Sequence, residues 1–105
     1  MALDITVTHE ADKCIVCVNG EVDVSNAAEL RSALEAALTG DTSKITADFS
    51  DVSYIDSTGI GVLVGIAHRA QEIQAVFVVA HPQKNVARVF DLLGVTEDLN
   101  VREND

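Results

Sequence analysis

The sequence predicts an α/β fold in which a mixed β-sheet packs against helices, in the order β-β-α-β-α-β-α with a short final strand as a candidate last element. Apolar residues alternate or run together in four short segments, as strands require, and three longer segments carry them at helical spacing. Hydrophobic residues make up 48% of the chain, which is enough for a core, and aromatic residues only 4%, so the core must be aliphatic. At 105 residues the chain forms a single domain, residues 1–105.

The first two strands are expected to form an antiparallel hairpin. Residues 3–9 alternate between apolar and polar side chains, and residues 13–18 form a second β-rich run after a short turn. Asn19 and Gly20 are typical of a turn and are expected to end the second strand. Residues 20–24 should then form a short extended or turn segment.

A first amphipathic helix is expected over residues 26–39. Ser25 and Asn26 have side chains that cap helix N-termini, and Glu29 lies in the first turn, where the helix dipole favours an acid. Gly40 stands where a C-terminal cap belongs. The apolar stripe at helical spacing consists of Leu30, Leu34, Ala37 and Leu38.

The middle of the chain predicts a strand at residues 44–49, a connection at residues 51–56 and a helix over residues 57–70. In the connection, Val52 and Ile55 are expected to pack inward. The helix should be largely buried, because apolar residues surround most of its circumference. These residues are Ile60, Val62, Leu63, Val64, Ile66 and Ala67.

The C-terminal third is expected to add a strand, a helix and an edge strand. Residues 75–80 are a continuous apolar run, typical of a strand covered on both faces, and should lie parallel to the strand at residues 44–49 through a right-handed crossover. Pro82 opens the next helix and Gly94 ends it. Residues 99–102 are the candidate edge strand. The stripe of the last helix is Val86, Val89, Phe90 and Leu93.

The charge of the chain limits its partners. Seventeen acidic and seven basic residues give a formal net charge of -10. Such a surface repels the phosphates of nucleic acids and anionic membrane lipids, so neither is an expected partner. It attracts a protein with a basic patch, although solubility alone explains the charge equally well. No signal peptide is visible, and the longest apolar stretch, residues 60–67, is too short to span a bilayer, so a cytoplasmic protein is expected.

Cys14 and Cys17 have C-x-x-C spacing, which raises the question of a redox or metal site. On a strand, residues three apart point to opposite faces and their Cα atoms lie roughly 10 Å apart, whereas a disulfide needs less than about 7 Å. A zinc site would need further ligands, and the sequence has no second cysteine pair and no closely spaced histidine pair. Two buried structural cysteines are therefore expected, with no metal and no cofactor.

The most informative segment is residues 56–63, D-S-T-G-I-G-V-L. It places the hydroxyl of Ser57 just after a strand and its connection, where a helix opens. The first turn of a helix leaves N–H groups unpaired and carries partial positive charge, so an anion there finds donors. A phosphate on Ser57 would bring about -1.5 to -2 charges to this surface without unfolding the domain. The simpler alternative is that Asp56, Ser57 and Thr58 only cap the helix.

Two kinds of active site are not favoured. Gly59, Gly61 and Gly65 are spaced one residue too widely for the dinucleotide fingerprint, and close packing of a buried helix on the sheet explains them better. A hydrolase would need a base beside Ser57, but no G-x-S-x-G elbow surrounds it. The protein is therefore not expected to be an enzyme. The histidines, expected on the surface or in loops, are His9, His68 and His81.

Three segments together resemble the STAS family, and within it the bacterial anti-sigma factor antagonists. They are residues 20–23 (GEVD), residues 52–63 (VSYIDSTGIGVL) and residues 89–95 (VFDLLGV). The resemblance covers residues 3–101, and D-S-T-G-I-G-V-L is its most specific part. It implies a single STAS domain with a mixed sheet and helices packed against it.

The resemblance also implies a phosphorylation-controlled partner switch. In such families the hydroxyl directly after the motif aspartate, here Ser57, is phosphorylated by an anti-sigma factor that is also a serine kinase. The unphosphorylated protein binds the anti-sigma factor, and the phosphorylated one releases it until a serine phosphatase resets it. A monomer or weak dimer acting in transcription regulation, in stress response or sporulation, is expected. The implied partner-binding residues are Asp23, Asp56, Ser57, Thr58, Gly59 and Ile60.

Two departures from the family pattern concern the choice of partner. The family often has Gly-Gly between the buried helix and the next strand, where this chain has residues 71–74 (QEIQ), and Cys14 and Cys17 are not a family motif. Neither removes the acceptor. The main alternative function is a structural STAS subunit of a multi-protein signalling assembly without direct sigma control. A phospho-receiver domain is less favoured, because the chain begins β-β-α and lacks an early acidic pair.

Overall fold

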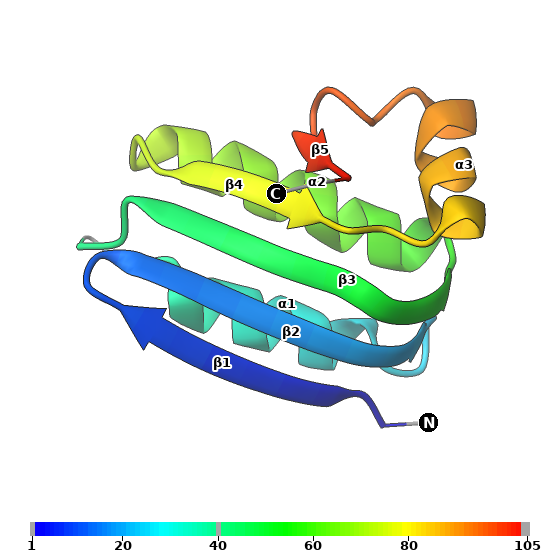
Figure 1. Cartoon of the computed structure of the whole chain (residues 1–105), viewed down its shortest axis with the longest axis horizontal. Helices are drawn as coiled ribbons and strands as arrows, with labels where there is room; N and C mark the ends of the chain where they lie inside the picture. The colour runs from blue at the N-terminus through cyan, green and yellow to red at the C-terminus, as the bar shows by residue number, and fades with distance from the viewer. Residues whose placement is uncertain (1, 40, 104–105) are drawn as a thin grey trace.

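The computed structural model of the chain describes residues 2–39 and 41–103. Five strands form one sheet in the order β1-β2-β3-β4-β5, with α1 and α2 behind it and α3 at one end (Figure 1). The succession of elements confirms the predicted order, including the short final strand. The elements are β1 (Asp4–Glu10), β2 (Lys13–Val22), α1 (Ala27–Ala37), β3 (Lys44–Ile55), α2 (Ser57–Glu72), β4 (Val76–Ala80), α3 (Lys84–Leu93) and β5 (Val101–Arg102).

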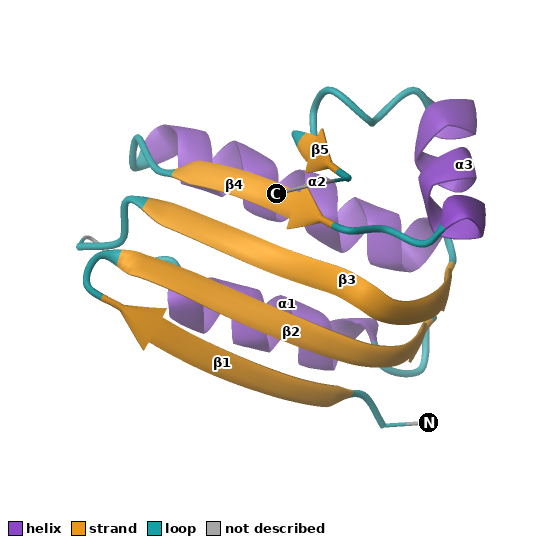
Figure 2. Ribbon diagram, in the orientation of Figure 1, coloured by secondary structure: helices purple, strands orange, loops and turns teal. Residues whose placement is uncertain are grey.

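The sheet is mixed, as predicted. β1 and β2 form the antiparallel hairpin, while β2, β3, β4 and β5 run parallel to one another. The predicted parallel pairing of residues 44–49 with residues 75–80 is therefore confirmed in the β3–β4 ladder. Both long helices lie on the same side of the sheet (Figure 2), so one face is covered by helices and the other is open over β2 and β3, although Val78 and Ala80 of β4 are buried on that side.

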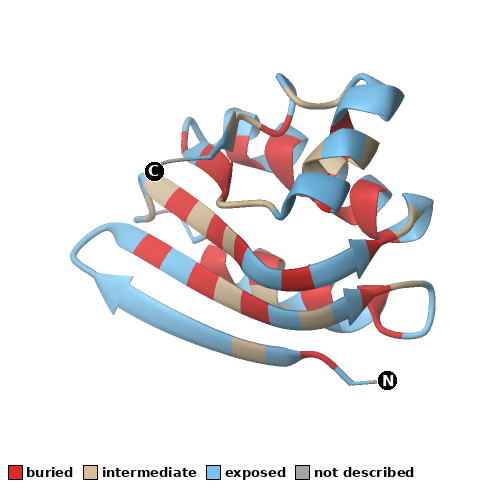
Figure 3. Cartoon of the chain, turned by 45° about the vertical axis from the view of Figure 1, so that its right-hand side comes forward, coloured by how far each residue is buried: buried red, intermediate tan, exposed pale blue. Residues whose placement is uncertain are grey.

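The core lies between the two long helices and the covered face. Buried and more exposed residues alternate along β2 and the first half of β3, and Figure 3 shows them as successive bands on these strands. Most buried side chains are aliphatic, with Phe49 and Phe90 the largest of the fully buried ones. The predicted aliphatic core is confirmed.

β2 and β3 both extend further than the sequence predicts. Much of the predicted turn at residues 20–24 and of the connection at residues 51–56 continues the two strands instead. Their pairing passes two register shifts, one of them beside Gly20, whose φ of +132° suits glycine. Pairing with a neighbouring strand thus overrides the local turn preference. The inward packing predicted for Val52 and Ile55 is confirmed, since both are buried.

The helix ends show two further differences. The side chain of Asn26 precedes α1 but makes no capping hydrogen bond, and α1 already ends at Ala37. The predicted cap Gly40 lies outside the described residues. α3 ends at Gly94 with φ of +70°, as predicted. Leu93, however, is 54% exposed rather than part of a buried stripe, because the last turn of α3 extends past the core.

Candidate functional site

The candidate site lies where the neighbouring parallel strands β2 and β3 end. Val22 and Ile55, the last residues of these strands, are register partners, and the N–H of Asp56 donates to the carbonyl of Val22 at 3.1 Å. The pairing therefore brings Asp23, which follows β2, next to the start of α2, which follows β3. The carboxyl end of parallel strands is also the edge at which sites in α/β folds collect.

Ser57 and Thr58 are the first two residues of α2, and both are exposed. Asp56 precedes them as the N-cap, and its Oδ1 accepts the N–H of Gly59 at 3.0 Å. Asp56 thus satisfies one of the N–H groups that a helix start leaves without an intrahelical partner. The Ser57 hydroxyl projects from the positive end of a 16-residue helix, where a negative group is favoured.

Gly59 fixes the first turn of α2 against the sheet. A Cβ at this position would lie 2.6 Å from Cγ1 of Val22 and 2.9 Å from Cγ1 of Ile55, so only glycine permits this approach. Ile60, next in the chain, is only 4% exposed. Gly59 and Ile60 therefore support the site from within, while Ser57 and Thr58 form its surface.

The close approach predicted for the other two glycines of α2 is wrong. A Cβ at Gly61 or Gly65 would meet nothing within 4 Å, and both residues are exposed. They line a hollow beside α1, together with Arg31 and Glu35, since a residue two positions from Gly59 points to a different side of the helix. Identical residue types on one helix thus have different reasons to be present.

Asp23 is held in a tight loop between β2 and α1. Its Oδ1 accepts hydrogen bonds from the hydroxyl of Ser25 at 2.5 Å and from the N–H of Ser25 at 2.9 Å. These bonds, the side-chain one above all, lower the pKa of the Asp23 carboxyl below its ordinary value. Asp23 therefore presents a negative charge beside the start of α2 at neutral pH.

The side chain of Asn26 holds this loop in place through hydrogen bonds to its backbone, a role that the sequence did not indicate. It is 1% exposed, the only buried polar side chain among residues 2–39 and 41–103. Its Oδ1 accepts the N–H of Asp23 at 2.9 Å, and its Nδ2 donates to the carbonyl of Glu21 at 2.7 Å. The capping prediction identified a polar residue at the right place but assigned its hydrogen bonds to the helix instead of the loop.

Apolar side chains are also exposed next to the site. Val24, in the loop after Asp23, is 75% exposed, and Tyr54, the residue before Ile55, is 49% exposed. Exposed aromatic and aliphatic groups beside fixed charges are typical of surfaces that bind other proteins. The end of β2 and β3 thus carries an exposed hydroxyl together with acidic and exposed apolar side chains.

The STAS domain sequence profile matches residues 2–104, nearly the whole chain. The chain belongs to the STAS family. An anti-sigma-B factor antagonist of Staphylococcus epidermidis is 31% identical to this STAS domain over 98 residues, 93% of this chain and 90% of the relative.

Solved structures share the fold of this STAS domain. The anti-sigma factor antagonist SpoIIAA in its unphosphorylated form superposes with a TM-score of 0.70 at 19% identity, over 85% of this chain and 83% of that one. Bacillus SpoIIAA in the phosphorylated form superposes with a TM-score of 0.72 at 18% identity, over 93% and 90% of the two chains. The predicted STAS-type fold is confirmed.

The cysteines of this STAS domain stand apart from the candidate site. Cys14 is buried and Cys17 is half-buried, and their alternating burial on β2 confirms that they point to opposite faces. Burial raises the pKa of both thiols, and the carboxylates of Asp48 and Asp51 raise that of Cys17 further. Cys17 is thus less buried than predicted.

Within the described chain, no helix is long and apolar enough to cross a membrane.

Proposed function

We propose that this STAS protein is an anti-sigma factor antagonist that works as a phosphorylation-controlled partner switch. The observation that carries the proposal is the exposed hydroxyl of Ser57 at the N-terminus of α2, beside Asp23 and Asp56. The curated relative bears the name anti-sigma-B factor antagonist, and SpoIIAA has been solved with and without phosphate. Both facts support this function.

A phosphate on Ser57 is compatible with the fold. The side chain is exposed, so the added group projects into water and displaces no core residue. The N-terminus of α2 stabilises negative charge, and nearby backbone N–H groups provide donors for the phosphate oxygens. Phosphorylation therefore changes the surface and leaves the packing beneath Gly59 as it is.

The same phosphate opposes docking. It adds about -1.5 to -2 charges to a surface that already carries Asp23 and Asp56. A partner that covers this surface has to remove the dianion from water and bring its own groups against three acidic side chains. Because each ~1.4 kcal/mol changes affinity tenfold, a few kcal/mol are enough to release the partner.

The partner in this proposal is an anti-sigma factor with serine kinase activity, and a serine phosphatase restores the hydroxyl. Thr58 and the exposed Val24 and Tyr54 lie at the edge of the same docking surface. The STAS protein is then the substrate of two enzymes and not itself an enzyme, and it acts in the cytoplasm, where sigma factors work. A structural STAS subunit of a signalling assembly remains the alternative function, favoured by the exposed apolar groups alone.

The test is to incubate the purified protein with candidate anti-sigma factor kinases and ATP, and to locate phosphate by mass spectrometry. We expect phosphate on Ser57 and loss of the complex. The Ser57→Ala variant should fold and hold its partner permanently, and Ser57→Asp should bind more weakly. Ser53→Ala, which alters another exposed serine just upstream, is the matched control and should behave like wild type.

Two outcomes would count against this function. If Ser57→Asp binds the anti-sigma factor as tightly as wild type, or if phosphate is found only at another residue, the charge argument is wrong. Stable assembly with other STAS proteins that no kinase alters would favour the structural alternative.

A further inference from the structure

The open face of the sheet carries a surface that the proposed switch does not use. α1 and α2 both lie behind the sheet in Figures 1 and 2, and no helix of residues 2–39 and 41–103 covers its front. The β2–β3 register places Lys13 opposite Lys44, Ile15 opposite Thr46, and the neighbouring Asp48 and Asp51 farther along β3. We define the open-face patch as Lys13, Ile15, Lys44, Thr46, Asp48 and Asp51.

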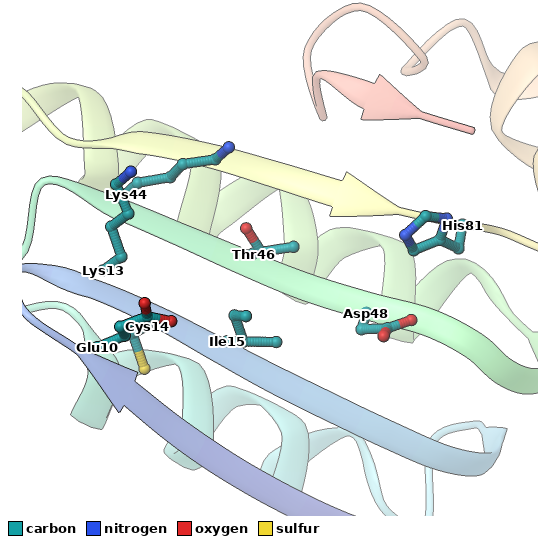
Figure 4. A pocket seen from close by; sticks show the side chains of 8 residues that line it. All are labelled: Glu10, Lys13, Cys14, Ile15, Lys44, Thr46, Asp48 and His81. Carbon is teal, nitrogen blue, oxygen red and sulfur yellow. The ribbon is translucent and has the colours of Figure 1, made fainter. Parts of the chain in front are cut away.

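The middle of the open-face patch is apolar and hollowed. Ile15 is 38% exposed although it lies on a central strand, and Thr46 beside it is half-buried. A hollow of about 270 Å³ lies over these two residues, and Figure 4 shows their side chains between the charged groups that line its ends. Covering an exposed isoleucine removes apolar area from water and so favours a partner at this place.

The two ends of the open-face patch carry opposite charges. Lys13 and Lys44 are directly opposite each other on β2 and β3. Two like charges in such a pair repel each other, which is unfavourable. At the other end, both Asp48 and Asp51 lie near enough to Cys17 to add to the effect of its burial on the thiol pKa. Figure 4 shows the two lysines at one end of the hollow, where Glu10 also lies, and Asp48 at the other end, near His81. With His81 neutral, the surface therefore has one end of net positive charge, an uncharged middle that contains Ile15, and one end of net negative charge.

We propose that the open-face patch docks a second copy of this chain around a two-fold axis that reverses the strand direction. Lys13 and Lys44 of one copy then face Asp48 and Asp51 of the other, and symmetry repeats the contact. Lys44 and Asp48 are four residues apart on β3, about 13 Å at ~3.3 Å per residue, so an axis through the middle of the patch exchanges the ends. Two sheets packed face to face at about 10 Å let the two Ile15 side chains cover each other.

A second copy is the occupant that this pattern favours. A foreign protein would need the reversed sequence of charges by coincidence, whereas a copy has it by symmetry. Ser57 begins a helix on the covered side of the sheet, so the dimer leaves both switch sites exposed. The inference is therefore independent of the proposed function and fails or succeeds separately from it.

The dimer is expected to be weak. Each copy carries a formal net charge of -10, which opposes their approach. Glu10 pairs with Lys13 from the edge strand and reduces the positive charge at that end. The patch is also much smaller than the roughly 20–30 residues that each side of a standard interface contributes. Association should therefore depend on protein concentration and be lost when either charged end is reversed.

The test measures sedimentation of the full chain between about 10 µM and about 1 mM, the range of weak association. Two double variants reverse one end each: Lys13→Glu with Lys44→Glu, and Asp48→Lys with Asp51→Lys. We expect wild type to associate as its concentration rises and each variant alone to stay monomeric. An equimolar mixture of the two variants should associate at least as tightly as wild type, because every charged contact in the mixed dimer joins opposite signs. Both variants keep a net negative charge, so net charge cannot cause their attraction.

A matched control makes the same charge changes away from the open-face patch. Lys84→Glu with Arg88→Glu, and Glu72→Lys with Asp98→Lys, alter exposed residues on other elements. These variants should associate like wild type, and mixing them should bring no gain. A gain equal to that of the patch variants would overturn the proposal, because it would trace the attraction to charge in general.

Two further outcomes would also overturn it. One is a wild-type chain and a mixture of patch variants that both stay monomeric at about 1 mM. The other is a monomeric chain whose patch variants lose a different bound protein, which would assign the face to that partner. If thermal unfolding shows that the patch variants do not fold, NMR spectra of the wild-type chain decide the question. The backbone amide signals of Ile15 and Thr46 should then shift as protein concentration rises, while those of α2 should not. Unchanged signals would refute the dimer.

Discussion

Gly59 gives the sharpest test of how α2 is seated on the sheet. Alanine at this position adds a methyl carbon 2.6 Å from Cγ1 of Val22 and 2.9 Å from Cγ1 of Ile55. Both neighbours are β-branched, stiff at χ1 and buried, so neither can swing aside. Overpacking of this kind costs about 1–3 kcal/mol, and the better helix propensity of alanine offsets at most about 1 kcal/mol of it. We expect Gly59→Ala to lower the free energy of unfolding by about 1–2 kcal/mol.

The assay is urea unfolding followed by far-UV circular dichroism. With an m-value of about 2 kcal/mol per molar urea, in the middle of the usual range, the midpoint of Gly59→Ala should fall by roughly 0.5–1 M without a change in slope. Gly61→Ala on the same helix is the matched control, because its added Cβ meets nothing within 4 Å. It should gain about 0.5–1 kcal/mol from helix propensity. A Gly59→Ala protein as stable as Gly61→Ala would show that α2 does not approach the sheet as described.

Two further predictions concern the loop that carries Asp23. Replacing Asn26 with alanine leaves two backbone groups without their buried partner. We expect this change to lower the free energy of unfolding by about 2–4 kcal/mol in the same urea assay. A loss below about 1 kcal/mol would contradict this role of Asn26. The pKa of Asp23 is lowered by folding, so its contribution to stability is present above the unfolded value of about 3.9 and is lost as pH falls through the lower folded pKa. Removing the hydroxyl with Ser25→Ala should raise the Asp23 pKa in a carboxyl NMR titration, and identical midpoints in both proteins would refute the assigned cause.

The order of elements was predictable because its signals are local and strong. Apolar runs of four to eight residues and stripes at helical spacing each need only their own segment to be recognised. The start of α2 was predictable for the same reason, since Asp56 carries cap chemistry and Gly59, three residues later, favours a tight first turn. Where one segment determines its own conformation, the sequence is sufficient.

The parts that were not predictable depend on partners distant in the sequence. Asn19 and Gly20 favour a turn locally, yet β3 lies alongside them and keeps them in a strand. Asn26 has the side chain of a helix cap, but its buried side chain bonds instead to backbone groups of Glu21 and Asp23. Gly61 resembles Gly59 in sequence and differs only in what faces it. Each error concerned what a residue faces in the folded chain, which the local sequence does not determine, and these residues lie in or next to the strands and helices that form the candidate site.

If Ser57 is the phosphorylation site, as proposed above, its position implies that the switch works through surface charge and not through a change of fold. The hydroxyl points to solvent, whereas two residues later Gly59 is locked against the ends of β2 and β3. A phosphate on Ser57 therefore has no packed neighbour through which to rearrange the core. The phosphorylated and unphosphorylated forms of SpoIIAA superpose on this chain about equally well, so SpoIIAA has this fold in both forms. The difference in affinity then arises only where a partner covers the dianion beside Asp23. Stability and switching are separable in such a design: Gly59→Ala acts on the first, and Ser57→Ala on the second.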